Sequence, residues 1–325
     1  MRRFPRKIVA ATTLGVLTLA RLRHARRRGL VRAITTFTTP DGKPWVVTLG
    51  RGRFVSVWDA GSGRRLRRLP VSDGPVHVAA FASSTGAPRL AVLAGNRSIQ
   101  FWDPETGDRV GELRVSETAP GSRLATWRTP SGRPRIAVIC GDGGIRVLDP
   151  EAGEGNEVPL IGHEGAATDL ATWRTPDGQL RLASSGNGVT LLWDLETGRE
   201  VGRLEGPRKR LSSVTAHTAP ERTLLVVIDK DGGYTLWDPD VEQQVASHRL
   251  PAGLEPGLAV PLPRLRIATG HRDGTVRVTD PATGDQLHET RFRRPVRAIA
   301  ALPDGVLVGL DNGWRTVRLA EDSAT

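Results

Sequence analysis

A short signature recurs at a nearly constant interval along this chain of 325 residues. An aspartate closes six β-type segments, and in four of them Trp precedes it: Trp58-Asp59, Trp102-Asp103, Leu148-Asp149, Trp193-Asp194, Trp237-Asp238 and Thr279-Asp280. Successive aspartates lie 44, 46, 45, 44 and 42 residues apart. A repeat of this length is one supersecondary unit, which buries its apolar face only by stacking against copies of itself.

The best-formed unit spans residues 162–200. Three β-type runs, 169–175, 180–185 and 189–194, are separated by turn residues and followed by a fourth run at 200–204. That pattern predicts an antiparallel meander of four strands. Seven units can be counted, and they end near residues 59, 103, 149, 194, 238, 280 and 319. The chain is therefore predicted to be all-β, a seven-bladed β-propeller of four-stranded antiparallel blades.

The seventh unit lacks a fourth strand. Only the polar residues 320–325 follow its third strand, and an unpaired sheet edge in a closed ring has to be covered. We expect the β-type segment 16–23 to pair there, so that an N-terminal strand closes the last blade. Residues 15–325 would then form a single domain, preceded by a disordered basic leader at 1–14. The alternatives are export or membrane anchoring through the apolar segment 8–20, and a mis-assigned start or a fragment of a longer protein.

The positive net charge is confined to one end of the chain. The first 33 residues contain ten Lys or Arg and no acid, which leaves 36 basic against 35 acidic residues in the remainder. A nucleic-acid partner is therefore not expected, and membrane contact is expected only through residues 1–28. Cys140, the only cysteine, lies in an apolar run and is predicted to be a core residue. Nothing indicates an oxidising compartment, so we expect a cytoplasmic protein, with membrane anchoring as the alternative.

The repeats resemble WD-repeat β-propellers over about residues 30–319. The Ala-Thr-Trp-Arg-Thr-Pro run at 171–176, with Leu-Ala-Ser at 182–184, is similar to bacterial members of that family. In the family, a His before the first strand, a Ser or Thr on the second, an Asp in the next turn and the Trp of the third strand form a buried hydrogen-bonded set. The resemblance implies such a structural network for the fourth unit, made by His163, Ser184, Trp193 and Asn187, the last standing where Asp is usual. The sixth unit supplies Thr269 and Asp273, with no matching His.

Catalytic and metal-binding motifs are absent from the sequence. It holds no G-x-S-x-G elbow, no phosphate loop and no cysteine cluster, and Ala167 stands where a zinc motif beginning at His163-Glu164 would need its second His. No carboxylate repeats at a position that would face the channel. We therefore expect no enzyme activity, no cofactor and no metal. A propeller enzyme with a metal in its channel is the alternative from another functional class.

In this architecture, the loops that enter the first strands and the turns between second and third strands gather on one face. We expect that face to bind a protein or peptide of unknown identity, so the chain would be a non-enzymatic, monomeric scaffold. The alternatives are a membrane-anchored or exported propeller, a regulatory fragment of a larger multidomain protein, and nucleic-acid or membrane binding through the basic arm. The candidate contact residues are basic residues of this face and a tryptophan expected at the surface: Arg208, Lys209, Arg210, Arg272, Arg293, Arg294 and Trp314.

Overall fold

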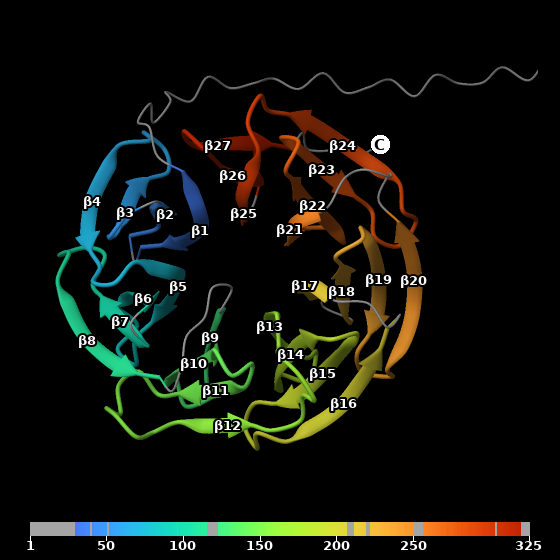
Figure 1. The fold of residues 1–325 in the computed structure, drawn as a ribbon, viewed down its shortest axis with the longest axis horizontal. Coiled ribbons are helices and arrows are strands. Elements are labelled where there is room, and N and C mark those ends of the chain that lie inside the picture. The colour runs from blue at the N-terminus through green and yellow to red at the C-terminus, as the bar shows by residue number, and fades with distance from the viewer. Residues whose placement is uncertain are drawn as a thin grey trace, which may run out of the picture.

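The computed structural model describes residues 30–39, 41–50, 52–95, 97–115, 123–206, 211–218, 222–249, 256–302 and 304–319. Within these ranges the regular elements are all strands, and they form seven antiparallel sheets arranged as a ring (Figure 1). No helix in the described ranges has the length and apolar character needed to cross a membrane.

Each sheet is one blade, and its strands follow one another in chain order. The strands of blades 1 to 3 are β1 Val31–Thr38, β2 Pro44–Gly50, β3 Phe54–Asp59, β4 Arg65–Pro70, β5 Pro75–Ala82, β6 Pro88–Ala94, β7 Ser98–Trp102, β8 Arg109–Arg114, β9 Leu124–Arg128, β10 Pro134–Ile139, β11 Ile145–Leu148 and β12 Val158–Leu160. Those of blades 4 and 5 are β13 Asp169–Arg174, β14 Leu180–Gly186, β15 Val189–Asp194, β16 Glu200–Glu205, β17 Leu211–Thr218, β18 Thr223–Asp229, β19 Gly233–Asp238 and β20 Gln243–Arg249. Blades 6 and 7 contain β21 Pro256–Leu262, β22 Arg266–His271, β23 Thr275–Thr279, β24 Gln286–Arg291, β25 Val296–Leu302, β26 Gly305–Leu310 and β27 Gly313–Arg318.

The first strand of each blade lies nearest the centre of the ring, and the fourth strands form its outer rim (Figure 1). Six sheets have four strands, and β25, β26 and β27 form the described part of the seventh. The predicted seven-bladed propeller is therefore confirmed. The predicted closing strand at 16–23 and the leader at 1–14 lie outside the described residues, so both stay predictions.

The hydrophobic core is divided among the interfaces between neighbouring blades. Seven clusters of buried side chains occur, one for each pair of adjacent blades. The last cluster joins the two ends of the ring, since Val31, Ile34 and Val46 of blade 1 pack there with Leu307 and Trp314 of blade 7. Packing between blades therefore explains why the repeat period is so constant.

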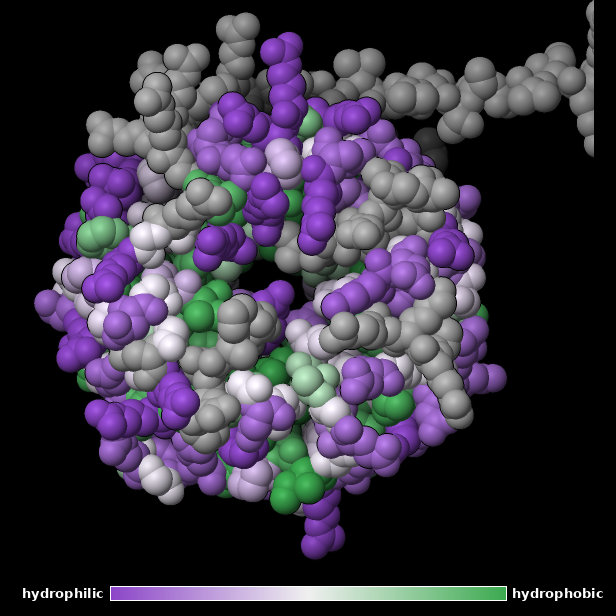
Figure 2. All heavy atoms as spheres, in the orientation of Figure 1, coloured by the Kyte–Doolittle hydropathy of each residue, from purple (hydrophilic) through white to green (hydrophobic). Residues whose placement is uncertain are grey.

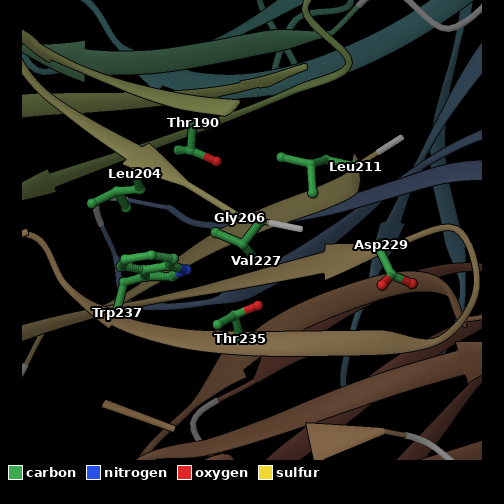
Figure 3. A pocket seen from close by; sticks show the side chains of 8 residues that line it. All are labelled: Thr190, Leu204, Gly206, Leu211, Val227, Asp229, Thr235 and Trp237. Carbon is green, nitrogen blue, oxygen red and sulfur yellow. The ribbon is translucent and has the colours of Figure 1, made fainter. Parts of the chain in front are cut away.

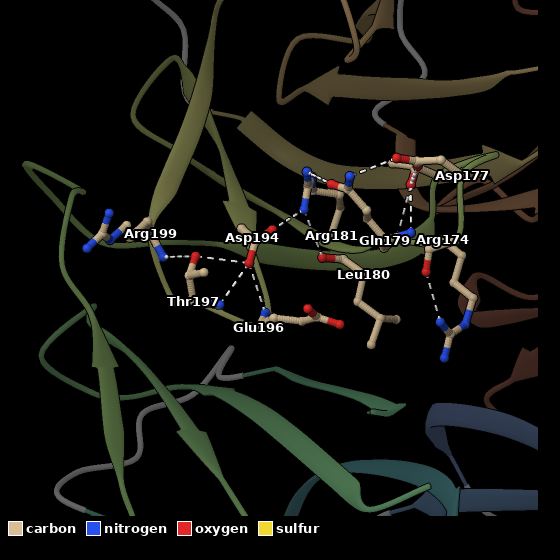
Figure 4. Close-up of polar contacts among 11 residues, drawn as sticks. Arg174, Asp177, Gln179, Leu180, Arg181, Asp194, Glu196, Thr197 and Arg199 are labelled. Carbon is tan, nitrogen blue, oxygen red and sulfur yellow. Dashed lines mark hydrogen bonds and ion pairs between the residues drawn. The ribbon is translucent and has the colours of Figure 1, made fainter. Parts of the chain in front are cut away.

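The aspartates of the repeated signature hold turns in place. In blade 4, Asp194 Oδ1 accepts hydrogen bonds from the backbone N–H groups of Glu196 (3.0 Å) and Thr197 (2.8 Å), and Asp194 Oδ2 accepts one from Arg181 (Figure 4). The same ion pair recurs between Arg89 and Asp103 at 2.9 Å and between Arg135 and Asp149 at 2.6 Å. Each pair fastens the start of a second strand to the end of the third, so these charged residues are structural.

Candidate functional site

The hydrogen-bonded set expected in blade 4 is largely present. Trp193 Nε1 donates to Ser184 Oγ at 2.8 Å, and His163 Nε2 lies 2.7 Å from the same oxygen. Ser184 is completely buried, and burial lowers the pKa of His163, so the imidazole is neutral at pH 7. Asn187 differs from the expectation. It is exposed in the turn after β14 at a φ of +40°, and no hydrogen bond within the described part of the chain joins it to His163.

The other blades keep only parts of this set. Trp58 Nε1 donates to Thr48 Oγ1 at 2.8 Å in blade 1. In blade 6, Thr269 Oγ1 lies 2.9 Å from Nε2 of His271, a buried residue on the same strand. The sequence pattern missed His271 because it looked for His before the first strand. In blade 2, Val92 takes the place of Ser184, and Trp102 Nε1 has no hydrogen-bond partner among the described residues.

A hydroxyl at position 92 is expected to complete the blade 2 pair. Val→Thr normally costs about 1–2 kcal/mol in a core because it buries an unpaired hydroxyl. Val92→Thr should leave the free energy of unfolding within about 0.5 kcal/mol of the wild type, because Trp102 Nε1 can donate to the new oxygen. Val138→Thr is the matched control, since blade 3 has Leu148 in place of the Trp, and it should show the full cost. Equal losses in urea denaturation would contradict this account of Trp102.

A small cavity between blades 4 and 5 is not a ligand site. Its volume is about 10 Å³, and its lining includes Thr190 and Leu204 of blade 4 with Val227 and Trp237 of blade 5 (Figure 3). That volume holds about one water molecule. Val227 occupies the position that Ser184 has in blade 4. The cavity therefore lies where blade 5 lacks the hydroxyl of the hydrogen-bonded set.

Loops and turns of neighbouring strands meet on one face of the ring, as expected. The loops that lead into first strands contact the turns between second and third strands, which is shown by backbone hydrogen bonds from Gly95 N to Asp73 O (3.2 Å) and from Ala167 N to Gly143 O (3.1 Å). We call this the entering-loop face. Figure 2 views the ring along its axis and shows a central opening with hydrophilic side chains around much of it.

Three of the predicted contact residues are brought together on this face. Arg272 lies in the turn before β23, and Arg293 and Arg294 lie in the loop before β25; all three are exposed. Gly274 allows the two segments to touch. Its φ is +91°, its carbonyl accepts a 2.8 Å hydrogen bond from Phe292 N, and a Cβ there would lie 2.2 Å from the Phe292 carbonyl oxygen. The backbone therefore holds this arginine group in place.

Of the remaining predicted contact residues, Trp314 lies in the described part of the chain and does not join the group. Arg208, Lys209 and Arg210 lie outside the described residues. The prediction that Trp314 lies at the surface is wrong, because it is 7% exposed and its ring meets that of Trp58 edge-on at 6.5 Å between centroids. It pairs with Gly309 of β26 in the strand register, and it packs between blades 7 and 1 in the cluster that contains Val31 and Val46.

Basic side chains are concentrated on one side of the entering-loop face. We define the basic sector as the seven arginines that blades 6, 7 and 1 place there: Arg32, Arg53, Arg272, Arg291, Arg293, Arg294 and Arg297. The acids among them are Asp273, which lies 4.0 Å from Arg291, and Asp311, which pairs with Arg297. Blades 2 to 4 carry a mixed set on the same face, including Asp73, Asp142 and Glu164. The face is therefore electrostatically asymmetric.

A hollow on the entering-loop face lies between blades 3 and 4. Its volume is about 370 Å³, and Asp142, Arg146, Ile161 and His163 are among its lining residues. Arg146 is paired with Asp142 at 3.1 Å. Ile161 is 84% exposed, but no other large exposed apolar side chain lies beside it in the lining. The hollow has neither a consistent charge nor an apolar floor.

Polar contacts link the innermost strands of several blades. Ser213 Oγ of blade 5 donates to Asp169 Oδ2 of blade 4 at 2.8 Å, and Arg123 of blade 3 lies 3.8 Å from the other oxygen. Burial raises the pKa of Asp169. In blade 2, burial lowers the pKa of His77 to about 3, with a smaller effect of the Arg123 charge, and His77 Nδ1 has no hydrogen-bond partner in the described structure.

His77 is expected to make stability fall with acid. The unfolded chain takes up a proton near the usual pKa of 6.5, whereas the folded His77 stays neutral down to about 3. Its contribution is therefore present above pH 6.5 and lost as the pH falls, by about 2 kcal/mol at pH 5. His77→Leu should remove that part of the pH dependence. Urea denaturation at pH 7 and pH 5 measures it, and an unchanged pH dependence in the variant would contradict the assignment.

Comparisons with known proteins agree with the fold. No family model matches the sequence, and no curated protein matches it. The fold is similar to the crystal structure of the computationally designed Ika8 protein, with a TM-score of 0.62 and 17% sequence identity over 91% of this chain and 98% of that chain. An identity this low indicates a shared fold alone. Together with the seven sheets, it makes this chain a seven-bladed β-propeller.

Proposed function

We propose that this chain is a WD-repeat propeller of bacterial type that acts as a non-enzymatic scaffold, and that its entering-loop face binds a protein or peptide. The basic sector supports this most directly. Seven arginines project from one side of that face, and contacts through Gly274 fix the backbone that carries Arg272, Arg293 and Arg294. A preorganised group of charges steers a partner of opposite charge and fixes its orientation.

The charged and titratable residues that recur in the repeat make structural contacts within their own blades. Asp103, Asp149 and Asp194 hold turns and pair with arginines, and His163 bonds to Ser184 inside a blade. The arginines of the basic sector stand outside this repeated pattern. We therefore assign partner contact to them, and propose that Arg208, Lys209 and Arg210 extend the same surface in a cytoplasmic monomer.

The proposal is tested by partner capture with two triple variants, one on the entering-loop face and one on the opposite face. The tagged full chain is used as bait in an extract of the organism that encodes it. Arg272→Gln/Arg293→Gln/Arg294→Gln should lose the partner that the wild type retains. Arg64→Gln/Arg133→Gln/Arg199→Gln is the matched control, since it removes three exposed charges from turns of the opposite face and should retain the partner.

Two results would count against the proposal. One is a partner that both triple variants retain, because binding would then not involve the arginines of the entering-loop face. The other is a partner lost only with the control variant, which would place the site on the opposite face.

A further inference from the structure

We propose that a cavity at the entering-loop end of the central channel, between blades 7 and 1, binds the carboxylate side chains of an acidic peptide segment. The cavity has a volume of about 600 Å³ and is lined by Leu30, Arg32, Arg297 and Asp311. This inference rests on the proposed function and gives it a partner chemistry and a place on the face.

A β-bulge in each of the strands β1 and β25 places an arginine at the cavity. The pairing of β1 with β2 shifts between Val31 and Ala33, and that of β25 with β26 shifts between Val296 and Ala298. Arg32 and Arg297 are therefore the extra residues of two equivalent bulges on adjacent innermost strands. A bulge redirects its extra side chain away from the regular alternation of the strand.

The charge at this bulge position differs from blade to blade. The same irregularity occurs in blades 2, 5 and 6, where the extra residues are Val76, Ser212 and Gly257. Among the described bulges of the first strands, charged residues occur in blades 7 and 1, which are neighbours. The bulges of blades 7 and 1 therefore direct two cations to one cavity, whereas the other described bulges at this position carry uncharged residues.

The two arginines are not equally neutralised. Arg297 Nε lies 2.9 Å from Asp311 Oδ1, which fixes its guanidinium. Arg32 is exposed and has no acidic partner within the described part of the chain. The cavity therefore carries a net positive charge, and Arg293 and Arg294 lie in the loop that leads into the strand bearing Arg297. A carboxylate placed between Arg32 and Arg297 would gain charge-assisted hydrogen bonds from both.

A protein segment fits this surface better than a nucleic acid does. A nucleic acid binds through many phosphate contacts over an extended basic surface. Here the basic sector covers one side of the face, and Asp73, Asp142 and Glu164 on the remaining side would repel a phosphate backbone. A short acidic segment can reach the cavity from the basic side and avoid those acids.

The test uses a short fluorescein-labelled peptide of alternating Gly, Asp and Glu, and its amide counterpart of Gly, Asn and Gln. Fluorescence anisotropy measures the binding of each peptide to the full chain at low and moderate salt. The acidic peptide should bind more weakly as salt rises, and the amide peptide should not bind. Arg32→Gln/Arg297→Gln should weaken the acidic peptide by about tenfold or more. Arg64→Gln/Arg133→Gln, which removes two exposed charges from the opposite face, should leave its affinity unchanged.

Arg32→Gln alone provides a second test, because Arg32 takes part in no ion pair among the described residues and its loss leaves the Arg297–Asp311 pair intact. It should also weaken the acidic peptide while the melting temperature stays that of the wild type. Unchanged affinity in both the single and the double variant would overturn this site. So would equal binding of the amide peptide, or tighter binding of a single-stranded DNA oligonucleotide than of the acidic peptide. Partner capture that still depends on Arg272, Arg293 and Arg294 would then leave the proposed function standing without this site.

Discussion

Replacing Ser184 with Ala is expected to lower the free energy of unfolding by about 2–4 kcal/mol, which is large for the loss of one oxygen. That oxygen accepts the Trp193 indole hydrogen bond and contacts His163 Nε2, and both distances are below 3 Å. Alanine would leave the buried Trp193 indole N–H without an acceptor and the half-buried His163 Nε2 without its hydroxyl partner. An unsatisfied buried group costs about 1–3 kcal/mol, and the hydrogen bond lost by the half-buried His163 adds about 1 kcal/mol, which together give the expected range. Urea denaturation measures the change.

Two further variants separate this effect from a simple packing loss. Ser184→Thr keeps the hydroxyl and should recover most of the stability. Thr48→Val in blade 1 removes one hydrogen bond to Trp58 without changing the shape of the side chain, so it should cost about 1–2 kcal/mol. A Ser184→Ala loss no larger than that of Thr48→Val would show that the contact with His163 contributes nothing.

Replacing Gly274 with Ala is expected to cost about 2–4 kcal/mol and to weaken partner binding at the same time. The φ of +91° is unfavourable for alanine, and the new Cβ would lie 2.2 Å from the Phe292 carbonyl oxygen and 2.7 Å from that of Arg294. The loop before β25 would have to move away from the turn that carries Arg272. Thermal denaturation and partner capture with the same variant measure the two effects.

Gly178→Ala is the matched control for Gly274→Ala. Gly178 has a similar φ of +88°, but a Cβ there would meet nothing within 4 Å. This variant should cost only about 1 kcal/mol, which is the conformational part, and should leave partner binding unchanged. Equal losses of stability in the two variants would mean that the loop contact at Gly274 is not needed to hold the arginine group.

The blades could be predicted from sequence because their packing imposes a period on it. Asp194 must hold its turn and Trp193 must fill the gap to blade 3, so the aspartate recurs in five other units, and the Trp in three of these, at a nearly fixed spacing. The partner of the aspartate was not predicted. Arg181 is separated from Asp194 by a hairpin, and only the strand register brings the two together.

Single side chains in the candidate site were harder to place. Trp314 breaks the pattern of its unit and was expected at the surface, yet its register position is the one that Val55, Ile145 and Val276 fill with buried side chains. Arg32 and Arg297 carry no signal in the sequence, because a bulge is visible only in the pairing of β1 with β2 and of β25 with β26. The arginines at 272, 293 and 294 could be predicted because turns and entering loops share one face in any propeller.

Amide hydrogen exchange of the full chain, alone and with its captured partner, tests most directly that the entering-loop face is the binding surface. The account predicts slower exchange on binding for residues 272–275 and 292–298, and no change in the turns at 60–64 and 130–133 on the opposite face. Protection confined to those opposite turns, with the segments around Arg272 and Arg294 unchanged, would contradict it.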